Sequence, residues 1–377
     1  MENKKSKKKL DDLKFKIGVG LITGIGDVLA KKLISYCGSA EAVFAEKKSA
    51  LLKIPNVGET LAESITKSDV LAKAQKEVDF IVKHNINHSF YLDDDFPKRL
   101  KACPDAPVIF YYKGDVDFEN PKIVSVVGTR QATSYGKDLC NKLVDELYKR
   151  EHKPVIVSGL AYGIDICAHK AALRNDLQTI GVLGHGLSQL YPAAHKATAR
   201  EIIDNGALLT EFLSDSTIEK NNFVRRNRLI AGLSDLTIVV ESNIRGGALI
   251  TAEIANSYNR DVFAYPGRLT DSFSSGCNWL IKTNKAHLLQ SVDDIEYIMG
   301  WDKEPEKHVS QAQQELFPDI SEEEENLLRL LRENDECTID NLYLAAQMPV
   351  SKVSAMLLNL ELSGFVQSLP GKVYKAV

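Results

Sequence analysis

The stretch Lys122-Ile123-Val124-Ser125-Val126-Val127-Gly128-Thr129-Arg130 consists of a strand-like run that ends in a glycine-bearing turn. A helical pattern follows over residues 137–149, and a second apolar run over 155–158 ends in another glycine turn. A helix over 164–173 and a strand over 179–183 continue the alternation. Strands that alternate with helices in this way predict right-handed β-α-β units with parallel strands.

The alternation continues to about residue 265. Further strands and helices are expected, in chain order, over residues 193–204 (helix), 207–212 (strand), 224–233 (helix), 236–241 (strand), 248–258 (helix) and 262–265 (strand). The pattern predicts an α/β fold built on a doubly wound, Rossmann-like parallel sheet with helices over both faces. We assign residues 89–300 to this domain.

A degenerate repeat precedes the sheet. The segments 22–30 and 54–62 each contain an apolar residue, a glycine hairpin and a helix rich in small residues. This pattern predicts a helical domain of the helix-hairpin-helix or SAM-like type over residues 10–88, after a basic tail over 1–9. The hairpin glycines could bring backbone amides close to a phosphate, or the domain could bind another protein, and the sequence favours neither.

A smaller domain is expected at the other end of the chain. Residues 301–320 combine prolines, glutamines and acids without periodicity, which is typical of a linker. Three helices and a terminal hairpin over 321–377 predict a winged helix. Its expected recognition helix, 351–362, carries only Lys352 as a base against Glu361. This balance favours protein contact over groove binding.

Composition excludes several classes of protein. The 377 residues carry a formal net charge of −4, and the six cysteines show no C-x-x-C spacing, so neither a zinc site nor a disulfide framework is expected. No run of about 18 apolar residues occurs, and the lysine-rich start lacks a signal-peptide core. We therefore expect a cytoplasmic protein without membrane contact. Neither a P-loop nor G-x-G-x-x-G is present, so no nucleotide cofactor is expected.

Basic residues gather before one of the expected helices. The stretch Asn222-Phe223-Val224-Arg225-Arg226-Asn227-Arg228-Leu229-Ile230-Ala231-Gly232-Leu233-Ser234 indicates a basic turn that leads into a buried helix. Glycine turns at the carboxyl ends of the expected strands fall on the same rim of the sheet, where ligands of such folds bind. Backbone amides and guanidinium groups together are suited to the phosphates of a nucleic acid.

Six motifs occur in the order typical of one known family. They are Val127-Gly128-Thr129-Arg130, Ser158-Gly159-Leu160-Ala161-Tyr162-Gly163-Ile164-Asp165, Gly184-His185-Gly186-Leu187, Arg226-Asn227-Arg228-Leu229-Ile230-Ala231-Gly232, Gly247-Ala248-Leu249-Ile250-Thr251-Ala252 and Gly276-Cys277-Asn278-Trp279-Leu280-Ile281. Over residues 120–290 the chain resembles the DNA processing protein A (DprA/Smf) family. It departs from the family pattern at Gly246 and Ala248, where serines are common, and at Ser188 and His195.

The resemblance implies a non-catalytic bacterial protein without a cofactor. Such a protein binds single-stranded DNA regardless of sequence, protects incoming strands and helps to load the RecA recombinase in natural transformation. A homodimer is also implied.

Site residues follow from the resemblance together with side-chain chemistry. Amides of Gly128 and Thr129 and the guanidinium of Arg130 would bind phosphate, and a second cradle would form around Ser158 and Gly159. Arg226 and Arg228 would line the path of the strand. The remaining candidates, which include tyrosines that could stack on bases, are Tyr135, Leu160, Tyr162, Arg225, Asn227, Gly246 and Gly247.

An enzyme of a different class remains as an alternative. Gly246-Gly247-Ala248-Leu249-Ile250-Thr251-Ala252-Glu253 partly matches the Gly-Gly-x-Gly-Thr-x-x-Glu motif of lysine-decarboxylase-like N-glycosidases. Leu249 replaces the third glycine, which would crowd a ribose or phosphate. We therefore expect Glu253 to be a surface or ion-pair residue.

Overall fold

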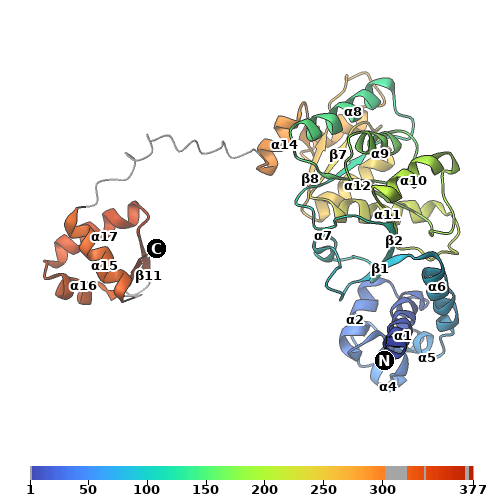
Figure 1. Ribbon diagram of the computed structural model, residues 1–377, viewed down its shortest axis with the longest axis horizontal. Helices are drawn as coiled ribbons and strands as arrows, with labels where there is room; N and C mark the ends of the chain where they lie inside the picture. The colour runs from blue at the N-terminus through green and yellow to red at the C-terminus, as the bar shows by residue number, and fades with distance from the viewer. Residues whose placement is uncertain (1, 302–320, 335–336, 370–372, 377) are drawn as a thin grey trace. The chain divides into compact units, whose positions relative to one another are not determined.

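The protein is built around a large mixed sheet (Figure 1). The computed structural model describes all residues except 1, 302–320, 335–336, 370–372 and 377, and it divides into the units Met1–Trp301 and Asp302–Val377. In the described part of the first unit, nine strands have the order β1-β2-β6-β5-β4-β3-β7-β8-β9. Apart from Trp301, the predicted linker lies outside the described residues.

Seven strands of this sheet are parallel, and two antiparallel strands extend one edge. The parallel strands are β3 (Ile123–Val127), β4 (Val155–Ser158), β5 (Thr179–Val182), β6 (Gly206–Thr210), β7 (Leu236–Val239), β8 (Asp261–Ala264) and β9 (His287–Leu288). The antiparallel strands, which the sequence did not indicate, are β1 (Asn87–Phe90) and β2 (Ile109–Gly114). The predicted doubly wound, mostly parallel sheet is confirmed.

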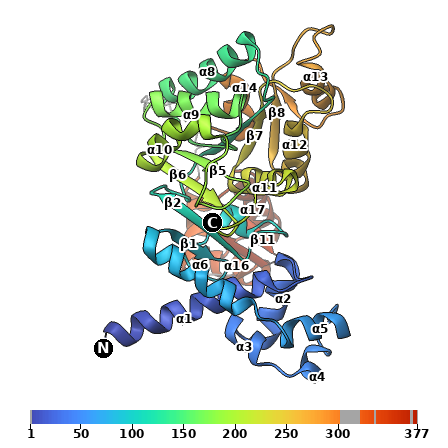
Figure 2. The same ribbon diagram turned by 90° about the vertical axis from the view of Figure 1, so that its right-hand side faces the viewer.

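Helices cover both faces of the sheet, as Figure 2 shows. One layer contains α8 (Ser134–Lys149), α9 (Ile164–Arg174), α10 (Lys196–Asp204) and α14 (Val292–Met299). The other contains α7 (Lys98–Lys101), α11 (Lys220–Leu233), α12 (Gly247–Ser257) and α13 (Ser275–Lys282). Along β3, Val124 and Val126 pack toward α8, whereas Ile123 and Val127 belong to the core under α11. This alternation separates two apolar cores.

The order of the strands reverses between β3 and β7. From β3 the chain builds β4, β5 and β6 on one side, and α11 then returns it to β7 on the other side. At such a switch point the loops beyond the carboxyl ends diverge and leave a crevice. The parallel register places Val127 opposite Val239, so the two loops start side by side.

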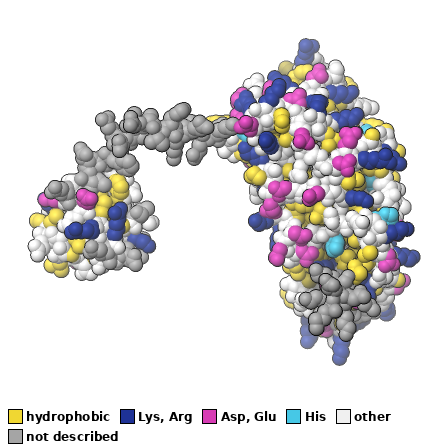
Figure 3. Space-filling model, in the orientation of Figure 1, with side chains coloured by type: hydrophobic (Ala, Val, Ile, Leu, Met, Phe, Trp, Pro, Cys, Tyr) yellow, Lys and Arg dark blue, Asp and Glu magenta, His cyan; other side chains and the backbone are white. Residues whose placement is uncertain are grey.

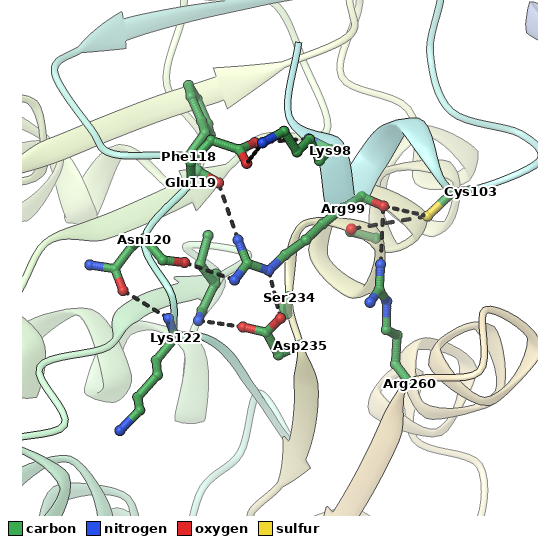
Figure 4. Close-up of polar contacts among 12 residues, drawn as sticks. Lys98, Arg99, Cys103, Phe118, Glu119, Asn120, Lys122, Ser234, Asp235 and Arg260 are labelled. Atoms are coloured by element: carbon green, nitrogen blue, oxygen red, sulfur yellow. Dashed lines mark hydrogen bonds and ion pairs between the residues drawn. The ribbon is translucent and has the colours of Figure 1, made fainter. Parts of the chain in front are cut away.

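Polar contacts hold the amino ends of the same two strands together (Figure 4). The Asp235 carboxylate accepts from the Ile123 amide at 2.8 Å and from Nε of Arg99 at 2.6 Å. Arg99 also donates to the carbonyl groups of Phe118 and Asn120, at 3.3 and 2.7 Å. The switch-point strands are therefore fixed at the end opposite the crevice.

The amino-terminal helices are α1 (Glu2–Leu21), α2 (Asp27–Cys37), α3 (Ala40–Ala45), α4 (Lys48–Leu51), α5 (Glu59–Thr66) and α6 (Val70–His84). From Glu2 on, the predicted basic tail is the start of α1. The internal repeat has the expected form, because Gly26 and Gly58 are the N-caps of α2 and α5. Among the described residues, no helix is long and apolar enough to span a membrane.

The second unit has its own apolar core, with Leu327, Leu331 and Leu357 at its centre. Its elements are α15 (Glu322–Glu333), β10 (Cys337–Thr338), α16 (Ile339–Ala346), α17 (Val350–Leu362), β11 (Val366–Leu369) and β12 (Val373–Ala376). The three strands pair in the order β10-β12-β11, which confirms the predicted winged helix. Lys352, on the expected recognition helix, forms an ion pair with Glu323 at 2.6 Å.

Candidate nucleic-acid interface

A crevice of about 730 Å³ lies at the carboxyl ends of β3 and β7. The loop after β3, one side of α11 and the loop that leads into α12 form its walls. Half of the residues predicted for the site line it, namely Gly128, Thr129, Arg130, Arg226, Asn227, Gly246 and Gly247. It also contains Asp165, Tyr191, Lys220 and Arg245.

Three of the cations in the crevice are exposed. They are Arg130, Lys220 and Arg245, and within the described residues none of them has an ion-pair partner. Elsewhere, on the face shown in Figure 3, basic and acidic side chains are interspersed. This local group of charges would attract a polyanion to the crevice.

Arg226 is a buried cation at the back of the crevice. Its side chain comes from α11, the residue is 3% exposed, and Nη1 donates to the Gly159 carbonyl at 2.7 Å and to that of Val182. Its Nε has no partner within the described residues. Burial lowers the pKa of Arg226 to about 10, so the group stays charged at neutral pH. An unpaired donor on a buried cation is costly, and the charge of Arg226 at the wall of the crevice favours an anion there.

Asp165 and Asn227 lie beside this arginine. Burial raises the pKa of Asp165, with the charge of Arg226 acting in the opposite direction. The Asp165 carboxylate accepts a hydrogen bond from the Ala161 amide at 3.4 Å. Asn227 lies in the middle of α11, not at its start, so its side chain does not cap this helix.

The start of α12 opens into the crevice. Gly246 is its extended N-cap, and no side chain caps this helix. A Cβ atom added to Gly247 would meet nothing within 4 Å, so the space in front of the first turn is open. The amino end of an uncapped helix attracts anions through its free amides and its dipole. It faces the same crevice as the exposed cations.

Three details of the predicted site are wrong. The Thr129 amide donates to the Glu241 carbonyl at 2.7 Å and is not free for a phosphate. Ser158 is fully buried, and its Oγ donates to the Val126 carbonyl at 2.6 Å. Leu160 is buried in an apolar cluster under α10. Gly159 instead makes room for Arg226, since a Cβ there would lie 2.6 Å from both Nη atoms.

The neighbouring arginines do not share the environment of Arg226. Arg228 contacts Asp27 at 3.0 Å, the Glu211 carboxylate and the Asp105 carbonyl, and it is outside the crevice. Arg228, predicted to line the path of the strand, is therefore occupied by protein groups and does not line the crevice. Arg225 is exposed and pairs with Glu211 at 3.3 Å. All three belong to α11, because the helix begins at Lys220 and not after the basic turn that we predicted.

The aromatic side chains in the crevice are Phe223 and Tyr191, whose ring centroids are 5.7 Å apart. The Arg130 guanidinium lies 5.7 Å from the centre of the Phe223 ring. Tyr135 and Tyr162, predicted as candidates for stacking on bases, are exposed but do not line the crevice. Phe223 faces the crevice because Gly184 provides room behind it, where a Cβ would lie 2.8 Å from the ring.

Glu253, the residue on which the enzyme alternative depends, is not in the crevice. It lies on α12 beside a separate hollow and pairs with Lys285 at 3.2 Å. The expectation that it is an ion-pair residue is confirmed.

The hairpins of the amino-terminal domain place carboxylates at their helix starts. Asp27, the first residue of α2, accepts from the Val108 amide at 3.0 Å and from Arg228. Glu59, the first residue of α5, pairs with Lys48 at 2.5 Å. A carboxylate in the first turn of each helix would repel a phosphate that approached the helix start. The geometry favours the protein-contact interpretation of this domain.

Gly163 packs closely against the backbone of the loop that contains Arg130. Its φ is +79°, and a Cβ would lie 2.1 Å from the Thr129 carbonyl oxygen. We expect Gly163→Ala to destabilise the protein by about 2–4 kcal/mol, because backbone strain and overpacking add. Urea denaturation measures this change. Gly38→Ala is the control, because φ of Gly38 is also positive but no atom of the described residues lies within 4 Å of an added Cβ. We expect it to lower the free energy of unfolding by about 1 kcal/mol. Equal costs in the two variants would contradict close packing under the loop.

Comparison with known proteins agrees with this geometry. A family model described as DNA recombination-mediator protein A matches residues 87–299, more than half of the chain. A Smf protein from Synechocystis is 30% identical over 94% of this chain and 96% of its own length. The chain belongs to the DNA recombination-mediator protein A (DprA) family. The flanking parts match a SAM-like helix-hairpin-helix tandem over 21–68 and a DprA winged helix domain over 310–372.

Two solved DprA structures are similar to this chain. DNA processing protein A from Streptococcus pneumoniae has 34% sequence identity and a TM-score of 0.65, with 75% of this chain and 97% of that one covered. The protein from Helicobacter pylori has 31% identity and a TM-score of 0.51, with 57% of this chain and 97% of that one covered. The Helicobacter structure is described as revealing a single-stranded DNA binding mode. The predicted membership of the DprA/Smf family is confirmed.

Proposed function

We propose that the protein binds single-stranded DNA in the crevice between β3 and β7, without chemical conversion of the strand. The observation that carries this proposal is the buried Arg226, whose Nε is unpaired, beside the exposed Arg130, Lys220 and Arg245. Guanidinium groups bind phosphate oxygens strongly because the hydrogen bonds are charge-assisted. Phosphates are shared by all DNA sequences, so binding would not depend on sequence.

The aromatic side chains of the crevice would favour single-stranded over double-stranded DNA. Phe223 and Tyr191 line the crevice next to Arg130, and an unpaired base can stack on such rings. Stacking contributes about 1–3 kcal/mol per base and tolerates every sequence. The bases of a duplex are paired and stacked on each other, so they cannot reach these rings. Gly246 and Gly247 would let a backbone phosphate approach the start of α12.

Membership of a recombination-mediator family and the DNA binding ascribed to the Helicobacter relative support a role in DNA uptake. We propose that the protein protects incoming single strands in the cytoplasm during natural transformation and helps to load RecA. We further propose that it acts as a homodimer. The domain limits that we propose are 10–88, 89–300 and 321–377.

Fluorescence anisotropy with a labelled mixed-sequence single strand tests the proposed function. The full-length protein is titrated at two salt concentrations, with a duplex of the same sequence as competitor. Affinity should fall steeply with salt, because each phosphate contact releases counterions with a slope of about −0.7 for single strands. The single strand should also resist the duplex competitor. Absence of binding at low salt by the folded protein would contradict the proposal.

Removal of the winged helix should leave this binding almost unchanged. We expect a variant that ends at Trp301 to bind the single strand within about threefold of the full-length protein, since the crevice belongs to the first unit and Lys352 is already paired. The same anisotropy titration measures the difference. A loss of affinity above about tenfold in a monodisperse truncated protein would place part of the DNA site in the second unit.

A further inference from the structure

Two cysteines lie where α8 and α9 pack against each other. Cys140 lies in the second turn of α8 and is fully buried, whereas Cys167 lies in the first turn of α9 and is partly exposed. Their contacts are reciprocal. Cys140 Sγ is 4.0 Å from the Ile164 carbonyl, and Cys167 Sγ is 3.6 Å from the Lys137 carbonyl.

We propose that Cys140 and Cys167 form a redox-sensitive thiol pair, which a peroxide converts to a disulfide that joins α8 to α9. Each thiol contacts the helix that carries the other thiol, and Cys167 Sγ also lies 3.7 Å from Oδ1 of Asn141, the residue next to Cys140. Disulfide formation requires side chains that point toward each other on closely packed backbone, and adjacent parallel helices provide this arrangement. Neither cysteine takes part in the proposed DNA site.

The surroundings favour Cys167 as the thiol that reacts first. Interaction with the Cys140 thiol lowers the pKa of Cys167, burial acts against it, and the charges of Arg174 and Lys137 lower it further. A thiolate that solvent can reach is the form that peroxides oxidise. By contrast, burial raises the pKa of Cys37, the partly exposed thiol of α2.

Oxidation of the two thiols by hydrogen peroxide takes place in two steps. The Cys167 thiolate attacks one oxygen of hydrogen peroxide and becomes a sulfenic acid, while the other oxygen leaves as hydroxide and takes up a proton to form water. The Cys140 thiol then attacks the Cys167 sulfur, the S–S bond forms, and the sulfenic oxygen leaves as water with the proton lost by Cys140. Two thiols have lost two electrons to one peroxide, and a dithiol reductant reverses the change.

The pair is connected to the crevice through Ile164. The Ile164 amide donates to the Thr129 carbonyl at 3.2 Å, and the Ile164 side chain packs directly under Gly128, where a Cβ would lie 2.4 Å from Cγ1. A disulfide draws the first turn of α9 toward α8 and so displaces Ile164. Gly128 and Thr129 lead to Arg130, so oxidation should weaken phosphate binding. This second consequence rests on the proposed function.

Intact-mass spectrometry of the full-length protein after treatment with hydrogen peroxide tests the pair. The expected product has lost two hydrogens, about 2 Da, and yields a linked peptide that contains Cys140 and Cys167. Cys37→Ser should keep this product, and Cys167→Ser should lose it. Cys140→Ala, which leaves no hydroxyl in the core, should stop at the sulfenic acid or its further oxides. A Cys167 that is oxidised only to sulfinic acid in the wild-type protein would overturn the proposal.

Anisotropy on the same samples tests the connection to the crevice. The disulfide form should bind the labelled single strand at least about threefold more weakly than the reduced form, and dithiothreitol should restore binding. Equal affinity of the two forms would overturn the connection through Ile164 and leave the thiol pair intact. If neither form binds DNA while the disulfide forms, the proposed function fails and the thiol pair stands.

Discussion

Reversal of two exposed charges in the crevice, Arg130→Glu with Arg245→Glu, is expected to weaken single-strand binding by at least about 100-fold. A hydrogen bond to a charged group contributes about 1.5–3 kcal/mol, and each loss of about 1.4 kcal/mol is a factor of ten in affinity. Neither arginine has an ion-pair partner in the described structure, so the melting temperature should change little. Anisotropy and thermal unfolding measure the two effects separately.

A matched control distinguishes the loss of contacts in the crevice from a general effect of net charge. Arg200→Glu with Lys149→Glu changes the net charge equally, at exposed positions on α10 and α8 that do not line the crevice. This variant should keep its affinity within about threefold at physiological salt, where charges beyond about 8 Å are screened. An equal loss in both double variants would mean that a general field, and not the crevice, attracts the strand.

The second large effect concerns stability. Arg228→Ala is expected to lower the free energy of unfolding by about 3–5 kcal/mol, because it leaves the buried Glu211 carboxylate without its closest cation. Glu211 is 4% exposed in its side chain, one of its oxygens already lacks a partner, and burial raises its pKa. The lost contact with Asp27 would also loosen α2 from the sheet domain. Urea denaturation measures the difference.

Arg225→Ala is the control for Arg228→Ala, since Arg225 also binds the Glu211 carboxylate but from an exposed position. Arg225→Ala should cost less than about 1 kcal/mol, as exposed ion pairs usually do. In a Glu211→Gln background, Arg228→Ala should cost less than in the wild-type protein, because no buried charge is left behind. Similar costs for both arginines would contradict a structural role for Arg228.

The sequence predicted the sheet more reliably than the site. The apolar runs 122–127 and 155–158 became β3 and β4 almost residue for residue, because buried parallel strands require continuous apolar segments. The edge strands β1 and β2 were missed. They pair antiparallel with the sheet, and their sequences, such as Asn87–Phe90, mix polar and aromatic residues without a clear period.

Three arginines in four positions looked equivalent in the sequence and differ in the structure. On a helix, Arg225, Arg226 and Arg228 point in different directions, so one is exposed, one reaches the crevice and one binds the amino-terminal domain. Their separation depends on where α11 begins, and no capping residue marks Lys220 as its start. Periodicity alone could not have assigned their roles.

The remaining wrong predictions have one cause: the sequence does not show which groups contact each other in the folded protein. The Thr129 amide and the Ser158 hydroxyl belong to residues with the right chemistry, but Glu241 and Val126 already bind them. Tyr191 was not predicted as a site residue, because nothing in the sequence places it against Phe223. Such contacts join segments that lie far apart along the chain.

Hydrogen–deuterium exchange of the full-length protein, with and without a thymidine oligonucleotide, tests the central claim most directly. Binding in the crevice predicts slower exchange in residues 128–133 and 243–250, and unchanged exchange in the hairpins near Gly26 and Gly58 and in α17. Protection of the hairpins or of α17, with no change in the two crevice segments, would contradict the account and move the DNA site to a flanking domain.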